Sequence, residues 1–225
     1  MVPLNPESFV NLVDHTLLKP DSKNEDLQKL CTEAREHKFF AICVHPYHLE
    51  FCKKALEGSA VKLATVVNFP LASNLQSQVE SECSEALRLG ADEVDTVVRL
   101  TEVKNKNWDV IHSELKRLKK LCQDQVLKVI LETCLLTEDE KIQVCKICED
   151  TGVDFVKTST GFSTSGATVE DIQLMKQHFS RGIKASGGIR DLATAEAMVQ
   201  AGATRLGLSA SVKILNELKT RGSSF

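Results

Sequence analysis

Short apolar runs alternate with longer amphipathic stretches along the whole chain. The amphipathic stretches at 21–38, 74–90 and 137–152 repeat apolar residues at spacings of three and four, which predicts helices. The apolar runs predict eight strands, at Val13–Thr16, Phe39–Val44, Val61–Val67, Glu93–Val98, Leu127–Glu132, Asp154–Thr158, Gly182–Ser186 and Thr204–Leu208. Strands that alternate with helices in this way favour parallel βαβ units joined by right-handed crossovers.

The number of strands and the chain length together favour a closed barrel. Eight strands in 225 residues fit a TIM (β/α)8 barrel with a short N-terminal helix better than an open doubly wound sheet. The junctions LGADEV, TGVDFV and AGATRL each place a glycine before a strand, as expected where one βα unit is reused. The first turn after a strand lacks the G-x-G-x-x-G pattern of dinucleotide-binding folds. We therefore expect a single α/β domain over residues 1–225.

Composition and charge narrow the range of partners. Hydrophobic residues make up 42% and charged residues 26% of the chain, which is typical of globular proteins. A net charge of −3 gives no general attraction to nucleic acid or to an anionic membrane, so an anionic ligand needs a local site. No apolar run approaches the roughly 18 residues of a membrane span, and the N-terminal segment lacks the pattern of a signal peptide. We expect a cytoplasmic protein.

The eight cysteines are scattered, and most lie among apolar neighbours. Without a secretory signal this pattern favours reduced core thiols over a disulfide framework. Cys145 and Cys148 form a C-x-x-C pair, but no second Cys or His pair lies nearby, so core packing is favoured over metal or redox chemistry. His15, His45 and His48 lack the spacings of zinc motifs, which favours structural or surface roles. We expect no metal and no cofactor.

Polar residues lie at the carboxyl ends of the predicted strands, where barrel enzymes carry their active sites. Lys157 follows an apolar pair on strand six, Lys184 lies on strand seven, and Asp95 lies on strand four. Two ammonium groups that are close together and partly dehydrated disfavour each other's charged form, and a neutral amine attacks carbonyls. Asp95 could then carry protons. The alternative is that both lysines are ordinary solvated strand ends.

Two glycine-containing loops indicate a phosphate site. Gly187-Gly188 follow strand seven and precede a helix start at Asp191, and Ser209 is expected to open the last helix. Backbone N–H groups in a glycine-rich turn or at a helix N-terminus donate to phosphate, and barrels commonly bind phosphate in the loops after strands seven and eight. The alternative is that the glycines only make a tight turn.

Seven segments match the motifs of one family. They are LVDHTLLKP, FAICVHP, GADEVDTVV, LKVILETCLLTEDEK, DFVKTSTGFSTSGATVEDIQLM, IKASGGIRD and AGATRLGLSAS. On these segments the chain resembles the deoxyribose-phosphate aldolases, a family of class I aldolases, over nearly its whole length. The run from Asp154 to Met175 and the IKASGGIR segment are the most specific.

The resemblance implies roles for individual residues. Lys157 falls on the Schiff-base lysine, Lys184 on a second lysine that perturbs the first, and Asp95 on the acidic proton donor and acceptor. Phosphate contacts fall on the Gly-Gly loop and the last βα loop, and other contacts lie near the sugar hydroxyls. The implied substrate-binding residues are Asp14, Thr16, Cys43, Thr160, Gly161, Gly187, Gly188 and Ser209.

The implied reaction is the reversible cleavage of 2-deoxy-D-ribose 5-phosphate to acetaldehyde and D-glyceraldehyde 3-phosphate, without a cofactor. A homodimer and a homotetramer both stay open. Three features depart from the family pattern: Arg99, which either helps to hold an anion or points at solvent, Ala210, and a tail that ends in Phe225. The alternatives are another phosphosugar class I aldolase or transaldolase-like barrel, and a non-catalytic phosphosugar-binding barrel.

Overall fold

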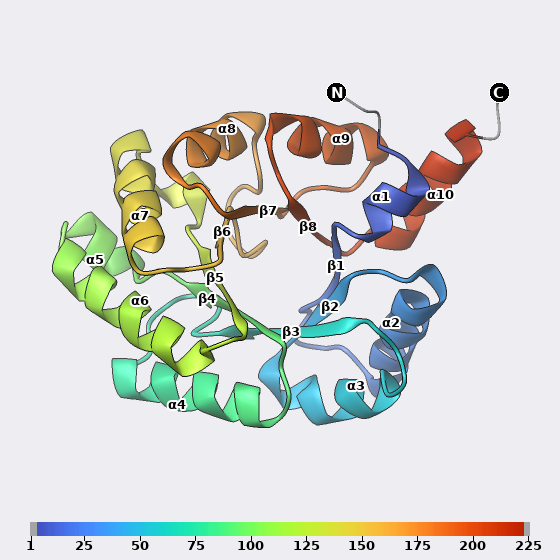
Figure 1. The fold of residues 1–225 in the computed structure, drawn as a ribbon, viewed down its shortest axis with the longest axis horizontal. Helices are drawn as coiled ribbons and strands as arrows, with labels where there is room; N and C mark the ends of the chain where they lie inside the picture. The colour runs from blue at the N-terminus through green and yellow to red at the C-terminus, as the bar shows by residue number, and fades with distance from the viewer. Residues whose placement is uncertain (1–3, 223–225) are drawn as a thin grey trace.

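The fold is a closed barrel of eight parallel strands surrounded by helices (Figure 1). The structure, a computed structural model, describes residues 4–222. Each strand pairs with the next in the chain, and β8 pairs with β1 to close the sheet. The strands are β1 (Val13–Leu17), β2 (Ala41–Val44), β3 (Lys62–Val67), β4 (Glu93–Val97), β5 (Val126–Ile130), β6 (Phe155–Lys157), β7 (Gly182–Ser186) and β8 (Arg205–Leu208). The predicted TIM barrel is confirmed.

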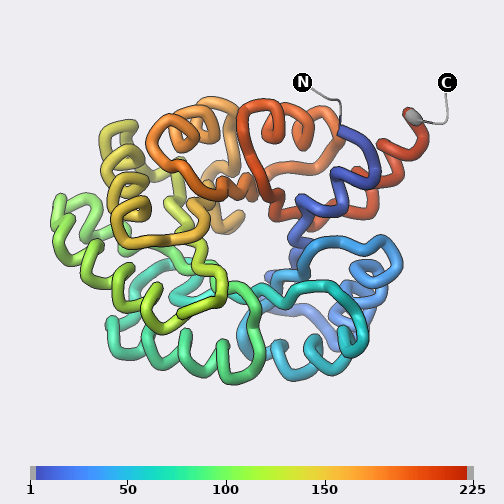
Figure 2. Tube along the Cα trace, viewed as in Figure 1, coloured from blue at the N-terminus to red at the C-terminus, as the bar shows by residue number. Residues whose placement is uncertain are grey.

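Helices cover the outside of the barrel. The helices predicted at 21–38, 74–90 and 137–152 correspond to α2, α4 and α7. The predicted short N-terminal helix is α1, which packs beside α10 (Figure 2). The α-helices are α1 (Pro6–Val10), α2 (Asn24–His37), α3 (Leu49–Ala55), α4 (Gln76–Arg88), α5 (Leu100–Lys104), α6 (Trp108–Cys122), α7 (Glu138–Asp150), α8 (Val169–His178), α9 (Leu192–Ala201) and α10 (Ser211–Gly222), and the short 3-10 helices are η1 (Pro46–His48) and η2 (Thr133–Leu135).

The main hydrophobic core lies between the barrel and its helices. Side chains alternate between the two faces of a strand, and outward-facing residues such as Val94 and Leu127 are fully buried in this core. Two small apolar clusters, which include Cys43 and Ile130, lie inside the barrel. Much of the remaining interior is filled by buried charged side chains, so the inward-facing positions of the strands carry the chemistry.

Two local details differ from the sequence expectations. Helix α10 begins at Ser211 and not at Ser209. The Ser211 hydroxyl donates to the carbonyl of Leu208 (3.1 Å) and bonds His15 Nδ1 (2.9 Å), which ties the helix start to the end of β8. Arg99 does not point at solvent, because its guanidinium pairs with Glu114 (2.9 Å) and joins α6 to the loop after β3.

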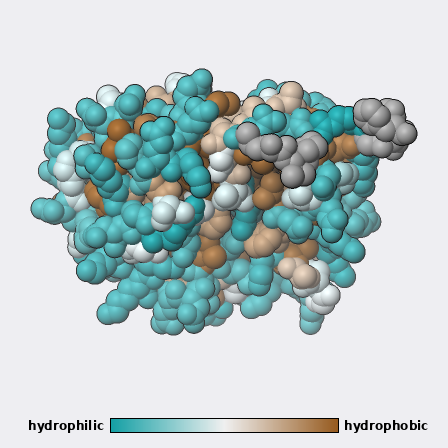
Figure 3. All heavy atoms as spheres, turned by 45° about the horizontal axis from the view of Figure 1, so that its top comes forward, coloured by the Kyte–Doolittle hydropathy of each residue, from teal (hydrophilic) through white to brown (hydrophobic). Residues whose placement is uncertain are grey.

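On the face shown in Figure 3 the surface is mostly hydrophilic, with small separate hydrophobic areas. Within residues 4–222, no helix has the length and apolar character that crossing a membrane requires. The tail ending in Phe225 lies outside the described residues.

Candidate active site

A pocket of about 330 Å³ opens at the carboxyl ends of the strands. Its walls come from the ends of β1, β6, β7 and β8 and the loops that follow them. Seven of the residues expected to act on or bind substrate line it: Thr16, Lys157, Thr160, Gly161, Gly187, Gly188 and Ser209. The other four do not line this pocket and are fully buried inside the barrel: Asp14, Cys43, Asp95 and Lys184.

The strand register brings Lys157, Lys184 and Asp95 together. Lys157 ends β6 and is the direct register partner of Lys184 on β7. The Nζ of Lys157 donates to Asp95 Oδ2 (2.9 Å), and the Nζ of Lys184 donates to the same oxygen (2.8 Å). The three residues lie far apart in sequence, but their side chains face inward, as the face alternation of their strands predicts, and they meet at one carboxylate oxygen.

The pKa values of the two lysines shift in opposite directions, although burial acts to lower both. Burial lowers the pKa of Lys157, Asp95 offsets this in part, and the neighbouring Lys184 lowers it further, so the net shift is downward. Burial also acts to lower the pKa of Lys184, but the carboxylates of Asp14 and Asp95 outweigh it and the net shift is upward. Lys157, only 3% exposed, is therefore the amine that gives up its proton more readily.

Asp95 stays ionised because cations surround it. Burial acts to raise the pKa of this carboxyl group, but Lys128, Lys157 and Lys184 outweigh burial and hold the pKa well below its usual range. An ionised carboxylate in contact with the Lys157 amine can accept a proton from it.

Three further charged residues in the barrel were missed by sequence reasoning: Glu93, Lys128 and Arg205. Lys128 Nζ contacts Glu93 (2.6 Å) and Asp95 (2.6 Å), and Arg205 stacks over the Phe40 ring at 3.8 Å. The signal was present, since LKVILE places Lys128 inside an apolar run just as DFVKTS places Lys157. The face alternation that pointed Lys157 inward applies to β5 as well.

The loops after β6 and β7 lie against each other beside the pocket. A side chain on Gly166 would put its Cβ 2.2 Å from the Gly187 carbonyl oxygen, so only glycine permits this approach. Gly187 itself has a φ of +82°. The Thr160 hydroxyl donates to the buried carboxylate of Glu132, a residue that sequence reasoning also missed, and this bond holds the first of the two loops.

Two basic side chains line the part of the pocket where phosphate is expected. Lys19 and Arg190 line the pocket together with Gly188 and Ser209, and all four are exposed. Helix α9 starts at Leu192 after the expected Asp191, whose carboxylate accepts from the backbone N–H of Thr194 (2.8 Å). The two cations make this part of the pocket suited to an anion.

The histidines and cysteines have structural partners. His15 bonds Ser211 and Glu33, and His45 bonds the carbonyl of Leu18. All eight cysteines are free and seven are buried, Cys145 and Cys148 among them, which confirms the prediction of core thiols. Within the described part of the chain, no cluster of three or more His, Cys, Asp or Glu side chains could hold a metal ion.

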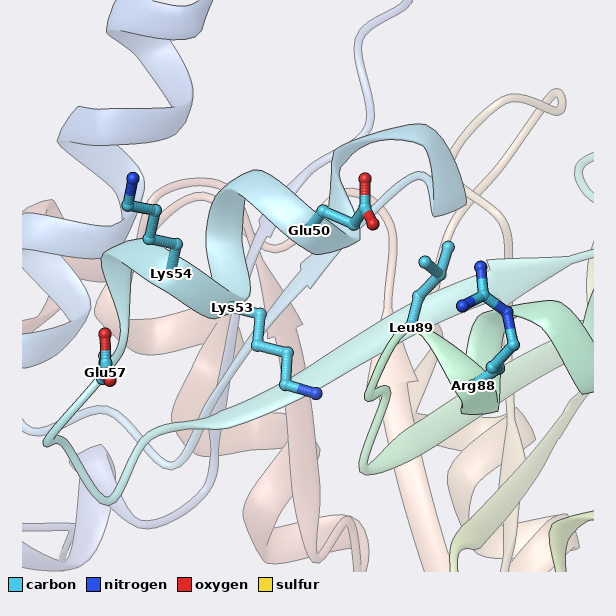
Figure 4. Close-up of a pocket in the computed structure, with 6 residues that line it drawn as sticks. All are labelled: Glu50, Lys53, Lys54, Glu57, Arg88 and Leu89. Atoms are coloured by element: carbon cyan, nitrogen blue, oxygen red, sulfur yellow. The ribbon is translucent and has the colours of Figure 1, made fainter.

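A second hollow, of about 550 Å³, lies beside the ends of α3 and α4 (Figure 4). Lys53 and Glu57 border it at the end of α3, and Arg88 borders it at the end of α4. Each helix in this fold runs antiparallel to the strand before it. The carboxyl ends of the helices therefore lie at the amino ends of the strands, away from Lys157. Acidic and basic side chains both border this hollow, and they do not point toward a common place where a ligand could bind.

Fold and site together define a class: a TIM-barrel enzyme of the aldolase type, with a buried lysine at its pocket. The match of residues 9–216 to the DeoC/LacD family aldolase model shows that the chain belongs to the DeoC/LacD aldolase family.

Curated relatives and solved structures agree with this assignment. The chain is 48% identical to a deoxyribose-phosphate aldolase of Brevibacillus brevis (95% of this chain, 97% of the relative) and 43% identical to one of Mannheimia succiniciproducens (99% and 100%). A solved structure described as a unique tetrameric deoxyribose phosphate aldolase from Aeropyrum pernix superposes with a TM-score of 0.90 at 31% identity, covering 96% of this chain and 93% of that one.

Proposed function

We propose that this chain is a deoxyribose-phosphate aldolase, which reversibly cleaves 2-deoxy-D-ribose 5-phosphate to acetaldehyde and D-glyceraldehyde 3-phosphate through a Schiff base on Lys157. One observation carries the proposal: an amine with a lowered pKa lines the pocket and contacts an ionised carboxylate. The names of the curated relatives supply the substrate.

The chemistry follows from these protonation states. The lone pair of neutral Lys157 attacks the C1 aldehyde, and loss of water from the carbinolamine gives a protonated imine. The electrons of the C2–C3 bond move into this cation as the bond breaks, which leaves an enamine on Lys157 and releases glyceraldehyde 3-phosphate. Protonation of the enamine and hydrolysis of the imine release acetaldehyde. Asp95, Lys184 and water move the protons.

In this proposal the phosphate group fixes the position of the whole substrate in the pocket. We place the phosphate against Gly187, Gly188 and Ser209, with Lys19 and Arg190 as additional cations. Asp14, Thr16, Cys43, Thr160 and Gly161 are assigned to the sugar end. Binding energy from the remote phosphate then orients the reacting carbons, which lowers the barrier without acting on the bond itself.

Covalent trapping tests the proposal. The enzyme is incubated with 2-deoxyribose 5-phosphate, reduced with borohydride and digested, and the adduct is mapped by mass spectrometry. We expect the label on Lys157, and Lys157→Met should lose both the label and at least about a thousandfold of the cleavage rate. Lys146→Ala, which removes an exposed lysine on α7, is the matched control and should keep both. A label elsewhere would refute the Schiff-base assignment.

Three further assignments accompany the function. We infer that residues 1–225 form one domain, because a single barrel accounts for residues 13–208 and α1 packs against α10. We infer a cytoplasmic enzyme from the free cysteines.

We infer a homodimer or a homotetramer, in view of the tetrameric relative, and light scattering after gel filtration distinguishes the two.

A further inference from the structure

Six charged side chains form a closed ring inside the barrel, here called the charge ring. In order round the ring they are Glu93, Lys128, Asp95, Lys184, Asp14 and Arg205. Lys128 Nζ joins Glu93 Oε2 (2.6 Å) to Asp95 Oδ1 (2.6 Å). Lys184 Nζ joins Asp95 Oδ2 (2.8 Å) to Asp14 Oδ2. Each contact joins an anion to a cation.

Arg205 closes the charge ring from β8. Its Nη1 contacts Asp14 Oδ1 (2.8 Å) and Glu93 Oε2 (3.1 Å). No member is more than 6% exposed, and Lys128, Asp95, Lys184 and Asp14 are 0% exposed. Charges removed from water to this degree act on one another strongly.

The charge ring is balanced without Lys157. Its three carboxylates and three cations sum to zero, since three negative charges meet three positive ones. Lys157 contacts only one member, Asp95, at an oxygen already shared with Lys184. A protonated Lys157 therefore adds an unmatched positive charge to a buried cluster, and a neutral Lys157 leaves it balanced.

We propose that Lys128, Glu93 and Arg205 are positioning residues whose balanced charge makes Lys157 the surplus cation and so keeps its amine neutral for attack. The proposal rests on the assignment of Lys157 as the nucleophile. It differs from the pairing of Lys157 with Lys184, because it assigns the control to three residues that do not contact the amine. Burial and the neighbouring Lys184 lower the pKa of Lys157, and Asp95 is the ring carboxylate that opposes them.

The other groups around Lys157 are a thiol, apolar side chains and one carboxylate that lies outside the ring. From β2 comes Cys43, whose burial raises the pKa of its thiol to about 11, so it carries no charge near neutral pH. From β3 come the apolar Ala64 and Val66. Glu132, beyond the end of β5, is bonded to Thr160 in the pocket loop. Among the described residues, the charged group within ion-pair distance of the Lys157 amine is Asp95.

Two opposite substitutions and their combination test the proposal. Glu93→Gln gives the ring one excess positive charge, so Lys157 should lose its proton at lower pH. Lys128→Met gives the ring one excess negative charge, so Lys157 should hold its proton to higher pH. Each displacement should be about one pH unit or more, given the strength of charge interactions in a partly dehydrated site. The double variant is neutral again and should titrate like the natural protein.

The titration is measured without substrate and then with it. In protein labelled with 13C at lysine Cε, the Lys157 resonance, assigned by its absence in Lys157→Met, is followed against pH by NMR. The acid limb of kcat/KM for the cleavage reaction should move in the same direction, because it reports the free enzyme. Circular dichroism establishes that each variant is folded. If Lys128→Met is unfolded, Glu93→Gln and the folded double variant still give the comparison.

The outcomes separate the two proposals. Opposite displacements that the double variant cancels support the charge ring as the control. Unchanged titration, or displacement in the same direction in both single variants, would overturn it even if borohydride still labels Lys157. A label absent from Lys157 in the natural protein would refute the proposed function, whereas the NMR titration would still decide whether the ring sets the protonation of this lysine.

Discussion

Lys157 and Lys184 are register partners, yet the pKa shifts of their amines have opposite signs. Both are buried, so dehydration alone cannot distinguish them. Lys184 donates to two carboxylates, Asp14 and Asp95, whereas Lys157 donates to Asp95 alone. At the scale of the residue, the number of carboxylate partners distinguishes the amine whose pKa is lowered from the amine whose pKa is raised.

Ser209 allows a residue-scale test of the phosphate site. Ser209→Asp places a negative charge beside the proposed phosphate, so KM for 2-deoxyribose 5-phosphate should rise roughly ten- to a hundredfold, because like charges in contact at a partly exposed site repel. The kcat/KM for unphosphorylated deoxyribose should stay nearly unchanged. Ser209→Asn is the neutral control of similar size. Equal effects on the two substrates would place the phosphate elsewhere.

The loop after β6 and the loop after β7 act as one unit at the scale of the element. The backbone N–H of Ala167 donates to the Gly187 carbonyl (3.1 Å), next to the close approach of Gly166. The first loop carries Thr160 and Gly161 and the second carries Gly187 and Gly188, so their contact sets the width of the pocket.

Gly166→Ala should separate these two loops. The added methyl group would lie against the Gly187 carbonyl, and the chain must move apart to accept it. We expect KM for the phosphorylated substrate to rise about tenfold, because the loop proposed to bind the phosphate is displaced, with a smaller change in kcat. Ser165→Ala, an exposed neighbour in the same loop, is the matched control. Steady-state kinetics that do not distinguish the two variants would contradict the coupling.

At the scale of the whole molecule, the barrel places its apolar core outside the sheet and much of its charge inside. The helices and the outward faces of the strands bury the hydrophobic side chains. The interior holds the charge ring, whose members come from β1, β4, β5, β7 and β8. The same ionised groups thus serve the site and link five strands, so the stability of the barrel should depend on their protonation.

Acid should therefore destabilise the protein as the buried carboxylates of the charge ring become protonated. Burial acts to raise the pKa of Asp14, but Lys184, Lys128 and Arg205 lower it to about 2 from its ordinary 3.8. Because the pKa is lower in the folded state, Asp14 stabilises the fold above pH 3.8, and this contribution is lost as the pH falls towards 2. The loss amounts to about 2 kcal/mol.

Urea unfolding at a series of pH values measures this loss. The unfolding free energy should fall between about pH 4 and pH 2, with a steeper slope than exposed carboxylates alone would give. Asp139→Asn, at an exposed position on α7, should leave that slope almost unchanged. A free energy that is constant across the range would show that the buried carboxylates are not ionised in the folded state.

Much of the fold could be predicted from the sequence because the hydrophobic patterns that define its helices and strands are local. Apolar runs and amphipathic stretches predicted the eight strands and the barrel, since the period of a pattern reflects the geometry of the element that it forms. The inward direction of Lys157 also followed from alternation along β6. The late start of α10 at Ser211 and the partners of Arg99 did not follow, because both depend on bonds to distant elements.

The linear pattern alone predicted the class of fold, the end of the barrel where the candidate site lies, and the candidate residues Lys157, Lys184 and Asp95. Only the tertiary structure decided that Lys157 is the amine with fewer carboxylate partners, and that Glu93, Lys128 and Arg205 complete a balanced ring beside it. The reason is physical. A repeat along the chain reports which face of an element is buried, whereas protonation depends on charges that the register of separate strands brings within a few ångströms.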